Sequence, residues 1–319
     1  MVKIVFLETK TLGDDINLSK FNKLGKVVFY ETSKEDEIAE RVTGADVVVV
    51  NKLPMNQKTL GDKTTVKLIC VTATGTNNID YIYTREKKIA VTNVKGYSTP
   101  TVVQHTFALY FYLMEHLAYY DNYVKSGQYA ESNLFTHLDR CFHDLQSMTW
   151  GIVGLGEIGR GVAAMAQAFG ADVIYYSTSG KNKNQDFLQV EFDELLGRSD
   201  VVSVHAPLNE NTKGLFGYEA FQKMKPSAYF LNLGRGHIVV EEDLARALNE
   251  NLIAGAGLDV LCKEPMTSEN SLLKVNNREK LIITPHIAWA SVEARERLME
   301  EVYKNIEAFQ NGEKRNVIE

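Results

Sequence analysis

Three residues in the last third of the chain could together carry out carbonyl chemistry: Arg235, Glu264 and His286. An arginine can bind a carboxylate through two parallel hydrogen bonds and polarise a carbonyl beside it. A histidine titrates near neutrality and can deliver a proton, and a neighbouring carboxylate favours its imidazolium form and orients the ring. Each residue also has a purely structural interpretation: a surface ion pair, a solvated loop charge and a packed histidine. Acting together, they predict the reduction of a 2-oxo acid.

The positions of these three residues along the chain indicate that their side chains lie close together in the fold. Arg235 follows the run "AYFLNLG", Glu264 follows "GAGLDVLCK" and His286 follows "IITP". Ligands of open parallel sheets bind outside the carboxyl ends of the strands, so the three side chains are expected in one crevice. Asp259, at the end of "GAGLD", is expected there too and could bind a nicotinamide amide group.

A glycine turn supplies the expected cofactor site. Gly154, Gly156 and Gly159 form a GxGxxG pattern that follows the strand-like run "TWGIV" and opens a helical segment. The first glycine permits a tight turn, the second lets the backbone approach a pyrophosphate, and the third allows close packing of helix and strand. The alternative is a glycine-rich turn without a ligand, but the strand before it and the helix after it favour a dinucleotide.

The residue that should select the cofactor departs from the usual pattern. An acidic residue is expected about 20 residues after the glycine turn, where it binds the adenosine ribose hydroxyls. The strand "DVIYYS" ends instead in Ser177, with Lys181 and Lys183 close by in sequence. Nothing acidic repels a 2′-phosphate there, so both NAD and NADP remain open; the two lysines also suit a solvated loop.

The elements that position these residues are short apolar runs alternating with helical patterns, which is typical of parallel α/β sheets. One series lies before residue 100 and a second follows it, so two α/β units are expected. The strands are predicted within 3–8, 26–31, 45–51, 67–75, 89–94, 149–156, 171–177, 200–207, 228–234, 254–260 and 281–287.

Two helical segments stand apart from these series. Residues 99–132 predict one long, aromatic helix, which is either buried in its own domain or part of an interface. Residues 291–319 predict one amphipathic helix that ends at Asn311–Gly312 and packs on a domain formed elsewhere.

Composition narrows the classes of function. The net charge of −6 gives no reason to expect nucleic acid or an anionic membrane as a partner. No apolar run approaches the ~20 residues that span a bilayer, and the N-terminus does not resemble a signal peptide. Cys70, Cys141 and Cys262 lack a CxxC spacing and are expected to be reduced thiols of a soluble cytoplasmic protein. No metal site is predicted.

At this point the chain resembles the D-isomer-specific 2-hydroxyacid dehydrogenases over nearly its full length, and most of all their glycerate dehydrogenase (hydroxypyruvate reductase) branch. The resemblance rests on "TATGTNNID", "GYSTPTVVQHTFAL", "GIVGLGEIGR", "SVHAPLNENTKGLF", "FLNLGRGHIVVEEDLARAL", "AGAGLDVLCKEP" and "ITPHIAWAS". It implies two doubly wound α/β domains: an NAD(P)-binding Rossmann domain of residues 100–287, inserted into a flavodoxin-like substrate domain of residues 1–99 and 288–319. It also implies a homodimer through the segment after residue 100.

The resemblance assigns roles residue by residue. It implies a catalytic set of Arg235, Glu264 and His286. Substrate binding falls on Lys52, Thr74, Gly75, Arg235 and His286, although Lys52 is equally well explained as an exposed loop lysine. Cofactor contacts fall on Gly154, Gly156, Glu157, Ile158, Gly159, Ser177, His205, Ala206, Pro207, Thr212, Leu233 and Asp259.

Two other functions stay open at this stage. The same chemistry could act on another 2-oxo acid, of the lactate type or larger. A protein that senses NAD(H) and binds a partner without catalysis could use the same scaffold. Turnover of small 2-oxo acids separates these possibilities.

Overall fold

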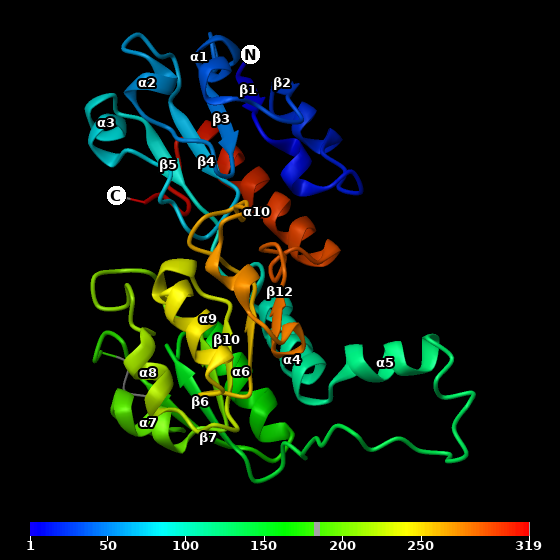
Figure 1. Ribbon diagram of the computed structural model, residues 1–319. Helices are drawn as coiled ribbons and strands as arrows, with labels where there is room; N and C mark the ends of the chain where they lie inside the picture. Colours follow the sequence, from blue (N-terminus) through cyan, green and yellow to red (C-terminus); the bar gives the residue numbers. More distant parts are fainter. Residues whose placement is uncertain (182–185, 319) are drawn as a thin grey trace. The chain divides into compact units, whose positions relative to one another are not determined.

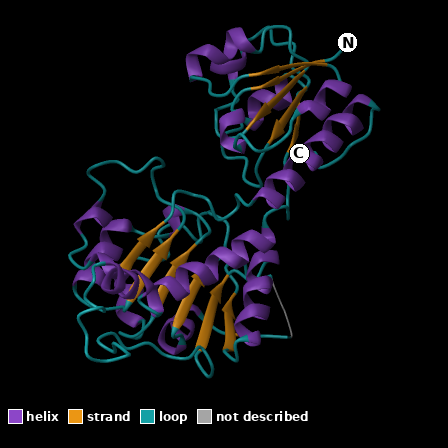
Figure 2. Cartoon of the chain, turned by 90° about the vertical axis from the view of Figure 1, so that its right-hand side faces the viewer, coloured by secondary structure: helices purple, strands orange, loops and turns teal. Residues whose placement is uncertain are grey.

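The computed structural model describes residues 1–181 and 186–318 of the chain (Figure 1). It divides into two compact units, one made of Met1–Ser98 and Ala290–Glu319, the other of Thr99–Trp289. In each unit, parallel strands form a sheet that is flanked by helices (Figure 2). The sequence prediction of two parallel α/β folds is therefore confirmed, as are all eleven predicted strands.

The first unit has a five-stranded sheet in the order β2-β1-β3-β4-β5, and these five strands pair with one another in parallel. This is the flavodoxin-like order, and its topological switch point lies between β1 and β3. The four valines of β3 are all buried, as expected for a strand covered on both faces. The strands are β1 (Lys3–Phe6), β2 (Lys26–Phe29), β3 (Val47–Val50), β4 (Leu68–Val71) and β5 (Ala90–Thr92). The helices are η1 (Thr9–Leu12), η2 (Ser19–Lys23), η3 (Glu35–Glu37), α1 (Ile38–Arg41), α2 (Gln57–Leu60), α3 (Tyr81–Glu86) and α10 (Val292–Gln310).

Helix α10, near the end of the chain, packs within this unit. Ser291 caps its first turn by accepting a hydrogen bond from the Ala294 N–H at 3.2 Å. Leu298, Val302 and Ile306 recur every four residues and are buried, and the helix packs against β4. The helix ends at Gln310 and is followed by its C-cap residue Asn311 and by Gly312, which takes a positive φ.

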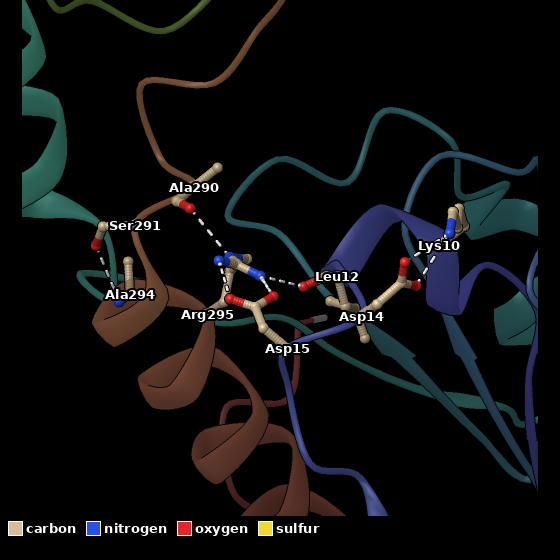
Figure 3. A network of polar contacts seen from close by, with 8 residues as sticks. All are labelled: Lys10, Leu12, Asp14, Asp15, Ala290, Ser291, Ala294 and Arg295. Carbon is tan, nitrogen blue, oxygen red and sulfur yellow. Dashed lines mark hydrogen bonds and ion pairs between the residues drawn. The ribbon is translucent and has the colours of Figure 1, made fainter.

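Arg295 of α10 connects this helix to the segment of residues 12–15 and to Ala290 (Figure 3). Arg295 donates to the Leu12 carbonyl at 2.7 Å and to the Ala290 carbonyl at 3.0 Å, and it pairs with the Asp15 carboxylate. The adjoining helical turn holds another segment, because Arg297 donates to the Tyr97 carbonyl at 2.9 Å. Tyr97, just before the chain leaves this unit, and Ala290, where the chain enters it again, are therefore both bound to α10.

The second unit has a seven-stranded sheet in the order β12-β11-β10-β9-β6-β7-β8. The chain leaves β6 toward β7 and later returns to β9 on the other side, so the switch point lies between β6 and β9. Only β8, two residues long, was not predicted, since such a short strand leaves no apolar run. The strands are β6 (Thr149–Val153), β7 (Asp172–Tyr176), β8 (Leu188–Gln189), β9 (Val201–Val204), β10 (Tyr229–Asn232), β11 (Gly255–Leu258) and β12 (Leu281–Ile283). The helices that follow these strands are α6 (Glu157–Ala168), α7 (Phe192–Arg198), α8 (Tyr218–Lys223), η4 (Gly236–Ile238), α9 (Glu241–Asn249), η5 (Ser271–Lys274) and η6 (Arg278–Lys280).

The prediction of one long helix over residues 99–132 is wrong. The segment forms α4 (Thr99–Met114) and α5 (Leu117–Lys125), which are separated where His116 takes a left-handed φ of 52°. Helix α4 packs against α6, β10 and β11, and its residues Phe107 and Tyr110 are buried. Helix α5 has no buried residue, so no core holds it in line with α4. The buried interpretation therefore holds for α4 alone.

Candidate active site

Glu264 and His286 lie in direct contact at the carboxyl edge of the second sheet. The Nδ1 atom of His286 is 2.7 Å from Oε2 of Glu264. The second oxygen of Glu264, Oε1, accepts a hydrogen bond from the Leu261 N–H at 2.9 Å, which fixes the carboxylate against its own loop. The side chains are 25% and 33% exposed, so the pair is accessible to a small molecule. With Nδ1 facing the carboxylate, Nε2 is the ring nitrogen left to deliver a proton.

A buried carboxylate holds the turn that carries His286. Asp259 follows β11 and accepts hydrogen bonds from the N–H groups of Ile287 at 2.9 Å and Ala288 at 2.8 Å. It also accepts one from the Thr284 hydroxyl at 2.6 Å. These bonds surround His286, whose φ of 56° lies in the left-handed region that non-glycine residues seldom adopt. Such a conformation persists only where the surroundings enforce it, and Asp259 does so here.

One residue of α4 completes this network. The Nε2 atom of His105 lies 2.9 Å from the Thr284 hydroxyl and 3.6 Å from Asp259. Burial lowers the pKa of His105, against the opposing effect of the Asp259 charge. A neutral His105 that donates through Nε2 leaves the Thr284 hydroxyl hydrogen for Asp259. Neither His105 nor Thr284 was predicted as a site residue, although a histidine within a largely apolar helix is a signal in the sequence.

Gly236, the residue after Arg235, lies against the loop that contains Glu264. A Cβ atom at Gly236 would fall 2.0 Å from the carbonyl carbon of Leu261, so the two loops touch through their backbones. Asn232, at the end of β10, accepts from the Gly234 N–H and donates to the Arg235 carbonyl, both at 3.0 Å. The Arg235 guanidinium donates to the Gly234 carbonyl at 2.8 Å. The three predicted catalytic residues thus come from loops after β10, β11 and β12, which are neighbours in the sheet.

The glycine turn has the close approaches that require glycine. Gly154 has a φ of 94°, and a Cβ there would lie 2.9 Å from the backbone of Ala206. A Cβ at Gly159 would lie 2.3 Å from the Gly154 carbonyl oxygen. Around Gly156, by contrast, no atom lies within 4 Å of the built Cβ position. Gly156 caps α6, whose first turn contains the N–H groups of Glu157, Ile158 and Gly159, the kind of groups that bind phosphates at helix N-termini.

Two side chains with buried polar atoms flank this turn. Ser177 follows β7 and His205 follows β9, the two neighbours of β6. Within the described residues, the Ser177 hydroxyl and both ring nitrogens of His205 are buried and have no hydrogen-bond partner. Burial lowers the pKa of His205 to about 3, which leaves the ring neutral. Buried polar atoms normally have partners, so these orphans fit a site for a polar ligand such as a dinucleotide.

The remaining predicted cofactor contacts lie at the same edge. Ala206 packs against Gly154, and Leu233 follows β10, where its N–H donates to the Val204 carbonyl at 3.4 Å. The Thr212 hydroxyl donates to the Pro207 carbonyl at 2.7 Å and so closes the loop after β9. Of the two lysines near Ser177, Lys181 is exposed and Lys183 lies outside the described residues.

The predicted substrate residues of the first unit also share one sheet edge. Lys52 follows β3, and Thr74 and Gly75 follow the neighbouring strand β4. Thr74 is fixed by two hydrogen bonds: its hydroxyl donates to the Val94 carbonyl at 2.9 Å, and its carbonyl accepts from the Asn93 amide at 2.6 Å. The N–H of Gly75 and the exposed Lys52 lie on loops at the carboxyl ends of these strands.

Three further observations concern membrane-spanning helices, the cysteines and possible metal ligands. No helix among the described residues is long and apolar enough to cross a membrane. All three cysteines are free thiols, and burial raises the pKa of Cys70 to about 12 and that of Cys262 to about 11. In the described ranges, no cluster of three histidine, cysteine or acidic side chains could hold a metal ion.

Comparison with known proteins identifies the fold family. The D-isomer specific 2-hydroxyacid dehydrogenase NAD binding domain matches residues 107–288. The chain is 37% identical over 318 residues to a glycerate dehydrogenase of Methylorubrum extorquens, and the match covers 99% of each chain. It is 38% identical over 324 residues to a hydroxypyruvate reductase of Blautia hydrogenotrophica, again over 99% of each.

Solved structures agree with this assignment. An acyclic imino acid reductase in complex with NADPH and D-Arg is similar at a TM-score of 0.88 and 28% identity, over 100% of both chains. The D-lactate dehydrogenase of Aquifex aeolicus, complexed with NAD and lactic acid, is similar at a TM-score of 0.81 and 28% identity, over 97% of this chain and 96% of that one. The chain belongs to the D-isomer specific 2-hydroxyacid dehydrogenase family.

Proposed function

We propose that this chain is an NAD(P)H-dependent reductase of small 2-oxo acids, with hydroxypyruvate or glyoxylate as substrate. The observation that carries the proposal is the contact of 2.7 Å between His286 and Glu264, on a sheet edge that also holds the glycine turn. The relatives named glycerate dehydrogenase, hydroxypyruvate reductase and glyoxylate reductase support this choice of substrate.

The reaction needs a hydride at the carbonyl carbon and a proton at its oxygen. Bound NAD(P)H supplies the hydride. His286 donates the proton from Nε2, and Glu264 holds Nδ1 and balances the charge of the imidazolium. Arg235 binds the substrate carboxylate and polarises the neighbouring carbonyl.

Further contacts divide between substrate and cofactor. The backbone around Thr74 and Gly75 binds the substrate carboxylate, and Lys52 adds a positive charge. The N–H groups in the first turn of α6 would bind the phosphates of the cofactor, and Ser177 and His205 would form hydrogen bonds with its polar groups. Asp259 could also reach the nicotinamide amide, although its oxygens already hold the turn around His286.

The choice between NADH and NADPH follows from Ser177. A serine neither repels a 2′-phosphate nor binds the ribose hydroxyls as a carboxylate does, so the chain can use either cofactor. Initial rates with hydroxypyruvate, glyoxylate, pyruvate and a bulky 2-oxo acid, each with NADH and with NADPH, test the proposal. Fast reduction of hydroxypyruvate or glyoxylate supports it. A preference for pyruvate or the bulky acid would show that the substrate is a different 2-oxo acid. Tight cofactor binding without any turnover would indicate a protein that senses NAD(H).

We also propose that the protein is a cytoplasmic homodimer. The segment after α4 projects away from the body of the second unit (Figure 1). Between residues 134 and 142 it exposes four large apolar side chains, which a second copy of the chain would cover: Leu134 (68% exposed), Phe135 (91%), Leu138 (73%) and Phe142 (53%). Light scattering should give twice the chain mass for the wild type and a lower mass for Phe135→Glu; a monomeric wild type would contradict this.

A further inference from the structure

Glu8 holds the loop that carries Lys52. One oxygen of its carboxylate, Oε2, accepts hydrogen bonds from the backbone N–H groups of Asn51 at 2.8 Å, Lys52 at 2.9 Å and Leu53 at 3.2 Å. Three successive N–H groups that converge on one point form the kind of concavity that binds anions in proteins. In this chain the anion is a side chain of the protein itself, 43 to 45 positions away in the sequence.

The contact lies at the switch point of the first sheet. Glu8 follows β1 and the loop 51–53 follows β3. These two strands are neighbours in the sheet, and the chain continues from them to opposite sides, from β1 to β2 and from β3 to β4. Ligands of such sheets bind outside the carboxyl ends of the strands at this point. On its other side the loop is held by Asn78, whose amide donates to the Leu53 carbonyl at 2.9 Å. Glu8 therefore fixes the N–H groups of the loop and Asn78 fixes a carbonyl.

We propose that Glu8 is a positioning residue that presets Lys52 for the carboxylate of the substrate. This inference rests on the proposed function. The carboxylate of Glu8 already binds the three N–H groups of loop 51–53. The substrate carboxylate therefore meets the Lys52 ammonium on this loop and not these N–H groups. It also orders the loop before the substrate arrives, which lowers the entropic cost of binding. Glu8 contacts neither substrate nor cofactor in this role.

The test compares three variants. Glu8→Ala removes the acceptor, Glu8→Gln keeps an amide oxygen without the charge, and Glu40→Gln is a control on an exposed glutamate of α1. We expect Glu8→Ala to raise the KM for hydroxypyruvate about tenfold, because three N–H groups lose a charged acceptor. The kcat and the affinity for NAD(P)H should change less than about twofold, Glu8→Gln should fall between Glu8→Ala and the wild type, and Glu40→Gln should match the wild type.

Hydrogen exchange supplies a readout that is independent of activity. Amides 51–53 should exchange faster in Glu8→Ala than in the wild type, whereas amides of β7 should not change. An unchanged KM in both Glu8 variants, or a loss of thermal stability with no change in KM, would overturn the inference. If the wild type itself reduces no 2-oxo acid, the proposed function fails instead, so the two failures are distinguishable.

Discussion

The Nδ1 atom of His286 lies 2.7 Å from Oε2 of Glu264, and the other oxygen of that carboxylate is bound by the Leu261 N–H. The carboxylate is therefore fixed by its own loop and in turn orients the imidazole. The backbone of His286 is held separately, through the bonds of Asp259 to Ile287 and Ala288. Ring and backbone thus have different supports, and each can be removed without the other.

Removing the charge that faces the ring should slow the reaction. In Glu264→Gln the amide oxygen can still accept a hydrogen bond from Nδ1, but it cannot balance an imidazolium. We expect kcat/KM for hydroxypyruvate to fall roughly tenfold, the difference between a charged and a neutral hydrogen bond. Glu242→Gln, on an exposed residue of α9, is the matched control. Equal kcat/KM values for the two variants would refute this role of Glu264.

Removing the support of the backbone should destabilise the second unit. In Asp259→Asn one carboxylate oxygen becomes an NH2 group, which accepts nothing from Ile287, Ala288 or Thr284. Leaving a buried donor unpaired should lower the free energy of unfolding by about 1–3 kcal/mol. Urea denaturation measures this change. If Asp259→Asn unfolds at the same urea concentration as the wild type, the turn around His286 does not depend on Asp259.

A negative charge at the end of β7 should change cofactor preference. Ser177→Asp places a carboxylate where the 2′-phosphate of NADPH is expected, and like charges a few ångströms apart repel. The ratio of kcat/KM for NADH to that for NADPH should rise at least about tenfold. Ser177→Ala, which adds no charge, should leave the ratio within about twofold of the wild type. If Ser177→Asp and Ser177→Ala have the same ratio of kcat/KM for NADH to that for NADPH, the adenosine ribose does not bind beside residue 177.

The ring of His205, whose two nitrogens are buried, should make the cofactor-free protein sensitive to acid. Its pKa is lowered to about 3 by burial, whereas an unfolded histidine titrates near 6.5. Between these values the unfolded state binds the extra proton, so stability is full above pH 6.5 and falls as the pH decreases toward 3. From pH 6.5 to 5 the loss is about 1.5 kcal/mol.

The variant His205→Leu should flatten this part of the stability profile. His237 is exposed, and His237→Asn is the control that should keep the wild-type slope. Urea denaturation of the cofactor-free protein between pH 5 and 6.5 measures both. If wild type and His205→Leu lose the same stability over this range, His205 is not the buried neutral group described above.

Much of the fold could be predicted because buried parallel strands leave continuous apolar runs, bounded by glycine and proline. Counting those runs also places Arg235, Glu264 and His286 after neighbouring strands, and the contact between the last two is present. Their catalytic roles remain predictions. The break at His116 could not be predicted, because it depends on where the core available to α4 ends.

The supporting residues escaped prediction for a related reason. Glu8 acts on a loop 43 to 45 positions away, and His105 on a threonine 179 positions away. Such pairs leave no local pattern, since their partners meet only in the folded sheet. The one sequence signal was a polar side chain at or just beyond the end of a strand. Asn232 is the last residue of β10, Asp259 follows β11 directly, and Glu8 lies two residues beyond β1.

The most direct test of the account is the rate of hydroxypyruvate reduction by His286→Ala. A single-turnover experiment with the preferred cofactor, together with a fluorescence titration of its binding, separates proton donation from cofactor affinity. We predict a loss of about 10²–10⁴-fold in the rate, the usual contribution of a general acid, with cofactor affinity within about twofold of the wild type. Turnover at the wild-type rate would show that another group supplies the proton.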